Sequence, residues 1–354
     1  MTTRTTEGRQ SGRDHAGRSA SMLDVAKAAG VSHQTVSRVI NGHPYVSVDT
    51  RERVVSVIEL LGYRPNGNAQ ALASGRQKHV TVLTSNTTLY GYAATIQGVE
   101  EAARSRGLSV GIRVLDSTEP ENTARDLSTN SGNLIIAAYD SAGWRALRSL
   151  GPSVPHAGVV GRSFPNKGRG KADPRWTWLD DREAAAQATK YLLDLGHETV
   201  YHVPIPAWAE DHQRQGGWRD ALILAGAAVP DLLPAGWDAH SGYKAGQLLA
   251  ANPSVTAVLC GNDDLALGVL RALHEAHLRV PEDISVIGFD DSPHSKYLAP
   301  SLSTVHLDFV GLGHAALNLL WEQMSDAPPR PVWAGKPELL IRESVGPVNF
   351  SRRA

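Results

Sequence analysis

Apolar residues follow two different patterns along this chain, and the change from one pattern to the other divides the chain into two parts. Within residues 21–61 they return every three or four positions, the spacing of amphipathic helices. From residue 77 onward, short runs rich in Val, Ile and Leu alternate with longer stretches of helical spacing. Residues 1–20 hold mainly Thr, Arg, Gly and Ser and cannot bury a face, so we expect a disordered tail there.

The helical part predicts a bundle of three short helices. Ser21, Ser32 and Ser47 precede them as candidate N-caps, because a serine hydroxyl can accept a hydrogen bond from the first helical turn. Gly30 suits the turn between the first two helices, since glycine adopts a positive φ at little cost. The predicted core positions are Leu23, Val25, Ala26, Ala29, Val36, Val39, Ile40, Val54, Val57, Ile58 and Leu61.

The second of these helices carries an unusually polar outer face. A generic three-helix bundle needs the same apolar pattern, but it does not need hydroxyl, amide and guanidinium groups together on one short helix. Helix, glycine turn and polar-faced helix form the helix-turn-helix arrangement, whose second helix enters the major groove of DNA. The polar positions of this helix are His33, Gln34, Ser37, Arg38 and Asn41.

From residue 77 the chain predicts two α/β lobes. Strands are expected over 80–83, 110–115, 133–138, 157–160, 177–179, 199–203, 257–260 and 284–289. Helices are expected over 95–106, 182–195, 215–224, 265–276 and 312–322. Repeated β-α-β spacing indicates parallel sheets with helices on both faces, and about 270 residues are enough for two such lobes.

The two parts of the chain also differ in net charge. Residues 1–76 carry ten Lys or Arg and six Asp or Glu, a net charge of +4, whereas the rest of the chain is −5. A basic head on an acidic body suits a phosphate-bearing partner at one end only.

Several function classes find no support in the sequence. No apolar run approaches 18 residues and no secretory signal precedes residue 21, so we expect a cytoplasmic protein without membrane segments. Cys260 is the single cysteine, and the 14 histidines show no metal-ligand spacing, so we expect no metal. Neither GxGxxG nor GxxxxGKS occurs, and no catalytic string stands out, so we expect no cofactor and no enzyme activity.

Residues 24–75 resemble the headpiece and hinge of the LacI/GalR family of bacterial repressors, including the string TVSRVIN. The resemblance implies that His33, Gln34 and Arg38 read base edges, a role that suits Arg with guanine and Gln with adenine. A solvent-exposed His33 without such a contact is an equal alternative. Positions that would contact phosphates or lie near them are Ser32, Thr35, Ser37, Asn41 and Thr50.

Residues 66–73 resemble the family's hinge helix. Eight residues cannot form a stable helix alone in water, so this helix should form only when two copies pair on DNA. Asn66 opens the segment, and Leu72 matches the leucine that wedges into a minor-groove base step. A flexible linker with an incidental leucine is the alternative.

The rest of the chain resembles the family's core, which shares its fold with periplasmic sugar-binding proteins. We expect the chain to cross between lobes near Trp178, Leu307 and Lys336. The expected divisions are a tail (1–20), a headpiece (21–65), a hinge (66–76), an N-lobe (77–178 with 307–336) and a C-lobe (179–306 with 337–350). Only eight residues follow Gly346, without leucine heptads, so we expect a homodimer rather than a tetramer.

The same resemblance implies an effector site between the lobes. Aromatic planes cover the apolar face of a sugar, and charged groups bind its hydroxyls. The expected effector residues are Leu89, Gly91, Tyr92, Arg214, Trp237, Asn262 and Asp290. Alternatives remain for Arg214 as a surface ion pair, for Asn262 and Asp290 as local caps, and for Trp237 as core. The family's galactoside-binding glutamine is replaced by Leu307, so the sugar is not identified, although Trp237 and Arg214 favour a β-glycoside over a purine.

These features predict a homodimeric repressor that binds a double-stranded operator and is switched by a small carbohydrate. Two alternatives remain open on the sequence alone. A solute-binding receptor would share the core but not the headpiece, and a related regulator would use a corepressor in place of an inducer.

Overall fold

The computed structural model describes residues 20–40, 45–63, 79–130, 132–161, 175–206, 213–324 and 334–349. The chain forms two compact units, Met1–Arg76 and Gln77–Ala354. Within the described ranges, no helix has the length and apolar character needed to span a membrane.

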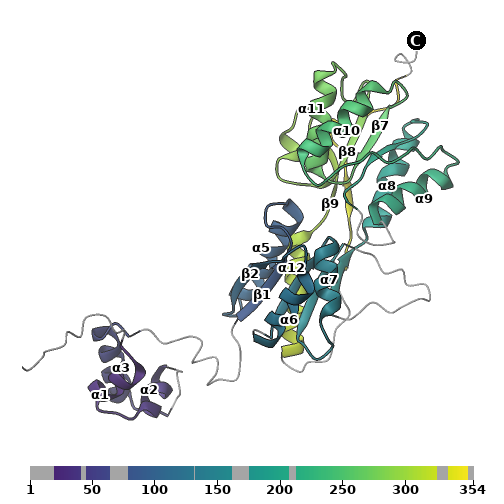
Figure 1. The fold of residues 1–354 in the computed structure, drawn as a ribbon. Coiled ribbons are helices and arrows are strands. Elements are labelled where there is room, and N and C mark those ends of the chain that lie inside the picture. The colour runs from purple at the N-terminus through teal and green to yellow at the C-terminus, as the bar shows by residue number, and fades with distance from the viewer. Residues whose placement is uncertain are drawn as a thin grey trace, which may run out of the picture. The chain divides into compact units, whose positions relative to one another are not determined.

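The first unit contains the three expected helices, α1 (Met22–Ala29), α2 (His33–Ile40) and α3 (Val48–Leu60) (Figure 1). Ser21 caps α1 in a reciprocal capping box, in which its hydroxyl accepts from the Asp24 amide and the Asp24 carboxylate accepts from the Ser21 amide. Gly30 has a φ of 65° and closes the helix, as its position in the sequence predicts.

The core of this unit differs from the prediction at both ends. Leu23 is 54% exposed and Leu61 37% exposed, so neither belongs to the core. Leu23 is out of phase with the buried face of α1, where Met22 packs instead. Tyr63 is buried because Gly62 adopts a φ of 58° and turns the chain back, with the Tyr63 amide bonded to the Ile58 carbonyl.

In the second unit, the first sheet has the strand order β10-β5-β4-β3-β1-β2, and every pairing in it is parallel. Its strands are β1 (His79–Thr84), β2 (Ser109–Val114), β3 (Leu134–Ala138), β4 (His156–Val160), β5 (Trp176–Leu179) and β10 (Ala334–Gly335). Side chains alternate along β1, so Val80 and Val82 join one apolar cluster while Leu83 joins another. The covering helices are α5 (Tyr90–Arg104), α6 (Pro120–Asn130), α7 (Ser141–Ser149) and α12 (Phe309–Met324).

The second sheet has the order β11-β9-β8-β7-β6. Its strands are β6 (Tyr201–Val203), β7 (Ala257–Cys260), β8 (Ser285–Asp290), β9 (Ser303–His306) and β11 (Glu338–Leu340). All pairings are parallel except that of β11, which runs antiparallel to β9. Helices lie on both sides of it (Figure 1): α8 (Asp181–Asp194), α9 (Gln213–Leu224), α10 (Ala239–Ala251) and α11 (Asp263–Glu275).

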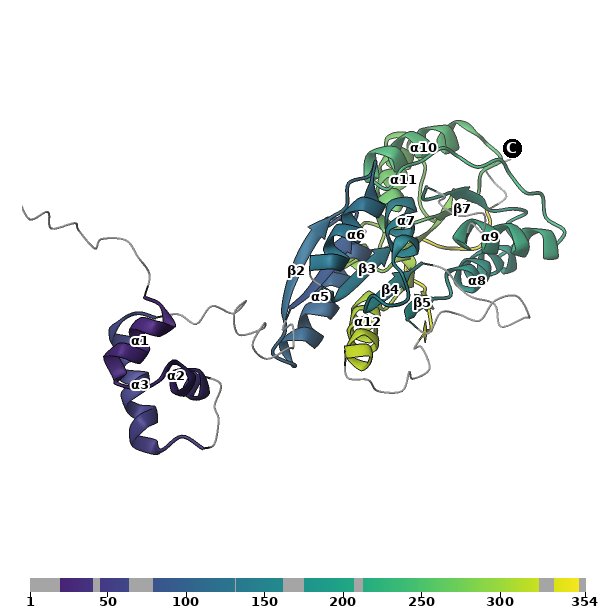
Figure 2. The same cartoon turned by 60° about the horizontal axis from the view of Figure 1, so that its bottom comes forward.

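The chain passes between the two sheets three times, after β5, after β9 and between β10 and β11. The second passage explains why the late helix α12 lies among the early elements of the first sheet, packed against α5 (Figure 2). Leu307 lies in this passage and is 1% exposed, so it is a core residue. The architecture confirms the predicted fold class, a three-helix headpiece and an α/β core whose sheets are parallel apart from β11.

Candidate functional site

A small cavity lies between the two sheets, and all seven residues expected to bind an effector line it. These are Leu89, Gly91, Tyr92, Arg214, Trp237, Asn262 and Asp290. Seven further lining residues were not predicted as ligand-binding: Tyr90, Tyr139, Gly161, Asp181, Ile205, Asp264 and Phe309. Most of the fourteen share one signal, which is that they follow the carboxyl end of a strand.

Topology explains why these residues meet. In the first sheet β1 lies between β2 and β3, so the connections after β1 and β3 leave toward opposite faces and open a crevice. Leu89 to Tyr92 follow β1, and Tyr139 follows β3 directly. In the second sheet, Asn262 follows β7 and Asp290 ends β8, so both sheets present their carboxyl ends to the cavity.

Aromatic rings form the wall that the first sheet contributes. Tyr92 and Tyr139 meet edge to face with ring centroids 5.0 Å apart, and Tyr139 and Phe309 at 5.7 Å. Tyr90 meets Phe309 at 6.0 Å. A Cβ at Gly91 would lie 2.9 Å from the Phe309 ring, so a glycine is required here for the ring to approach.

Hydrogen bonds fix the orientation of two of these rings. The Ser85 hydroxyl donates to the Tyr92 hydroxyl at 3.0 Å, and the hydroxyls of Thr95 and Tyr139 are 2.7 Å apart. Burial raises the pKa of both tyrosines, so their hydroxyls remain neutral donors and acceptors.

Arg214 is the centre of a buried ion cluster in the opposite wall. Its Nε donates to Asp181 at 2.8 Å, and its Nη1 lies 3.1 Å from Asp290 and also donates to the Gly261 carbonyl. Its guanidinium lies over the Phe289 ring at 4.2 Å. Arg214 is 9% exposed, which excludes the alternative of a surface ion pair.

Burial raises the pKa of Asp290 to about 8, and Asp263 and Asp181 add to this while Arg214 opposes it. Asp290 and its neighbour Asp291 both have positive φ, at 105° and 53°, a backbone conformation that is unfavourable for residues other than glycine. Partners hold this strained turn: the Asp291 carboxylate accepts from Arg342 at 2.6 Å and lies 3.1 Å from the His306 ring.

Asn262 links helix α11 to the segment that carries Trp237. Its side-chain oxygen accepts from the Leu265 amide at 2.7 Å and so caps α11, while its side-chain nitrogen donates to the Trp237 carbonyl at 2.9 Å. The capping alternative is therefore correct, and the same side chain also holds Trp237 at the cavity.

The cavity encloses about 60 Å³. Pockets that bury a drug-sized ligand usually measure about 300–1,000 Å³. A sugar can therefore enter only if the two sheets with their helices move apart or the lining side chains rearrange.

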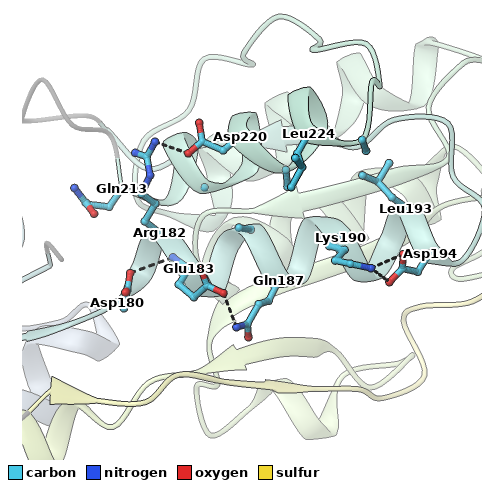
Figure 3. A pocket seen from close by; sticks show the side chains of 14 residues that line it. Asp180, Arg182, Glu183, Gln187, Lys190, Leu193, Asp194, Gln213, Asp220 and Leu224 are labelled. Atoms are coloured by element: carbon cyan, nitrogen blue, oxygen red, sulfur yellow. Dashed lines mark hydrogen bonds and ion pairs between the residues drawn. The ribbon is translucent and has the colours of Figure 1, made fainter. Parts of the chain in front are cut away.

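A much larger hollow, about 850 Å³, lies elsewhere, between α8 and α9 (Figure 3). Four of its charged residues form two ion pairs, Arg182 with Asp220 and Lys190 with Asp194. Apart from Asp180, the residues that directly follow the carboxyl ends of the strands do not line this hollow. We therefore regard the smaller cavity as the better candidate for ligand binding.

The headpiece displays the predicted polar helix. His33, Gln34 and Arg38 are exposed, and Gln34 and Arg38 lie one turn apart on the same side of α2. Ser37 is partly buried. Hydroxyls at the helix starts bond locally: Ser32 with Thr35 at 2.9 Å and Ser47 with Thr50 at 2.8 Å. The predicted contacts at Asn41, Asn66 and Leu72 lie outside the described residues.

Two further residues near the strands have structural roles. Trp218 is 1% exposed and its ring nitrogen donates to the Val200 carbonyl, so it belongs to the core, as does the fully buried Cys260. In the described part of the chain, no group of three or more His, Cys, Asp or Glu is arranged to hold a metal ion.

Comparison with known proteins adds to this geometry. Residues 21–66 match the lacI family of bacterial regulatory proteins, and residues 189–345 match the periplasmic binding protein-like domain. The probable HTH-type transcriptional repressor ExuR of Bacillus subtilis (strain 168) is 31% identical over 290 residues, which cover 80% of this chain and 85% of ExuR.

Solved structures resemble the chain over most of its length. A crystal structure of the Lac repressor dimer bound to operator and the anti-inducer ONPF matches with a TM-score of 0.81 and 26% identity, covering 93% of this chain and 100% of that one. A complex of the transcriptional regulator CelR with cellobiose matches with a TM-score of 0.65 and 27% identity, covering 92% and 99%.

Proposed function

The chain belongs to the lacI family of bacterial regulatory proteins and is a DNA-binding transcriptional regulator, and we propose that a small carbohydrate bound in the cavity switches its affinity for operator DNA. The observation that carries the proposal is the convergence of all seven expected effector residues on one cavity. The relatives support it, since CelR is solved with cellobiose and the Lac repressor with operator and ONPF.

In this proposal α2 lies in the major groove. Arg38 and Gln34 read base edges, with His33 beside them, while Ser32, Thr35, Ser37 and Thr50 lie near phosphates. Asn41, Asn66 and Leu72 complete the contacts, with Leu72 inserted in the minor groove.

The cavity has two complementary walls for a sugar. The tyrosines and Phe309 offer rings to its C–H face, with Leu89 and Gly91 at the same edge. Arg214, Asn262 and Asp290 offer polar groups to its hydroxyls, and Trp237 covers the remaining face. We assign the first sheet to an N-lobe (77–178 with 307–336) and the second to a C-lobe (179–306 with 337–350).

The small size of the cavity suggests how sugar binding is coupled to DNA binding. In this proposal a sugar fills the cavity by moving the two lobes apart, and the hinge pair then separates and DNA affinity falls. Such coupling between binding sites is typically about 1–3 kcal/mol. A corepressor would act through the same movement with the opposite sign.

Three further assignments belong to the proposal. The active species is a homodimer, whose two α2 helices read the halves of a pseudo-palindromic operator. It acts in the bacterial cytoplasm, where the operator lies. It catalyses no reaction on its ligand and uses no cofactor.

Substitution of Arg38 tests the DNA half of the proposal. Duplexes selected from a random library by the full chain supply the operator probe, and fluorescence anisotropy measures affinity. Arg38→Ala should lose about 1–3 kcal/mol of discrimination at one base position and keep its sugar affinity. Lys27→Ala, which removes one exposed charge from α1, serves as the control and should lower affinity for all duplexes equally. An Arg38→Ala variant with unchanged base preference would contradict the role of Arg38 in reading DNA. Weakened sugar binding would contradict the separation of DNA binding in the headpiece from sugar binding in the core.

A further inference from the structure

Among the described residues that line the cavity, carboxylates outnumber cations. Asp181, Asp264 and Asp290 line it, and Arg214 is the positively charged side chain in this described set. The guanidinium of Arg214 is already shared between Asp181 and Asp290. The third carboxylate, that of Asp264, is therefore not neutralised by the cluster.

Asp264 and its neighbour Asp263 differ sharply in their surroundings. Asp263 is 2% exposed, and its oxygens accept hydrogen bonds from the hydroxyls of Thr304, Ser292 and Ser295 and from the Ser292 amide. Asp264 is half-buried at the cavity and makes no hydrogen bond or ion pair with any residue that the structure describes. Partial burial raises the pKa of Asp264, and nearby His294 opposes this while Asp238 adds to it.

Carboxyl groups also lie near the opposite wall. The pKa of Tyr90, on the aromatic side, is raised first by burial and then by the charges of Asp291, Asp290 and Asp263. An anionic ligand placed between the walls would lie near these carboxylates, while the charge of Arg214 is already shared between Asp181 and Asp290. A cationic group would be attracted by the same carboxylates and by the faces of the aromatic rings.

On the basis of the carbohydrate effector proposed above, we propose that the preferred effector is a sugar with a protonated amine, and that Asp264 is the residue that selects it. The ammonium donates to the free carboxylate of Asp264, while the C–H face of the ring lies against the tyrosines. Neutral sugars bind more weakly, and sugars with a carboxylate or phosphate are rejected.

Asp264 also lies in the first turn of α11, where a negative charge stabilises the helix dipole. This structural role predicts an equal effect of its removal on every ligand. Selection of an amine predicts an effect on cationic sugars alone, so matched ligands separate the two roles.

Isothermal titration of the full chain at neutral pH provides the test. The probes are D-glucosamine, D-glucose and D-glucuronate, with the corresponding D-galactosamine, D-galactose and D-galacturonate to allow for either stereochemistry. We expect the amine in at least one series to bind about tenfold tighter than its neutral analogue, and the uronate to show no measurable binding.

Asp264→Asn should weaken the binding of the amino sugar by about tenfold and leave the affinity for the neutral sugar unchanged. Asp231→Asn makes the same change at an exposed site and should alter neither affinity. Equal or better binding of the neutral sugar overturns the amine preference while the carbohydrate proposal stands. Parallel weakening of both ligands by Asp264→Asn, or no binding of any of the six probes, also overturns it. The carbohydrate proposal itself is judged separately, by operator affinity against a panel of neutral mono- and disaccharides.

Discussion

Arg214→Met should destabilise the core strongly at neutral pH, because it leaves the buried Asp181 carboxylate without its cation and removes the Arg214 contact of Asp290. The side chains of Arg214, Asp181 and Asp290 are 10%, 7% and 14% exposed. Removal of one partner from such a pair costs about 3–5 kcal/mol, and the contact of the desolvated guanidinium with the Phe289 ring adds up to about 2 kcal/mol. Methionine keeps much of the apolar volume, so the loss reports on charge rather than on a cavity.

Urea unfolding followed by tryptophan fluorescence measures this loss as a shift in midpoint at unchanged slope. Arg104→Met is the matched control, because Arg104 pairs with Glu100 at the surface, where the side chains are 69% and 49% exposed. Its expected loss is below about 1 kcal/mol. If Arg214→Met lost no more than this control, the buried ion cluster would not have the energetic role assigned to it.

Two other changes test the cavity and its support. Asp290 has a folded-state pKa of about 8, above its unfolded value of about 3.9, so its stabilising contribution is present at low pH and is lost as the pH rises toward 8. Asp290→Asn should therefore flatten the fall in unfolding free energy between about pH 5 and pH 8; parallel pH profiles for the two proteins would count against the raised pKa. Gly217→Ala should cost about 1–3 kcal/mol, since its Cβ would lie 1.9 Å from the Arg182 carbonyl oxygen and force α8 and α9 apart. Gly151→Ala, whose Cβ would lie 4.0 Å from its nearest neighbour, is the control in thermal unfolding, and equal melting temperatures for both variants would refute the packing argument.

The sequence predicts those elements whose apolar pattern is strong. The buried strands β3 and β7 were expected within one residue of their observed bounds, because continuous apolar runs mark buried parallel strands. Helix α6 was missed because PENTARDLSTN has few apolar positions to show a period. Helix α10 was missed as well, since its glycines and alanines permit close packing against α11 without a clear apolar stripe.

The seven predicted residues of the candidate site were implied by the resemblance to the LacI/GalR family rather than by a local pattern. Arg214, Asn262 and Asp290 have chemistry that suggests a ligand, and two of them follow recognisable strands. Asp181 and Phe309 reach the cavity only because the chain crosses between the sheets just before them, which no local pattern encodes.

The measurement that tests the central claim most directly is operator affinity with and without sugar. Anisotropy titrations of the full chain on a selected duplex should show a change of about 5–150-fold in the dissociation constant when a bound sugar saturates the cavity. An operator affinity that no sugar alters, although the sugar binds, would contradict the account.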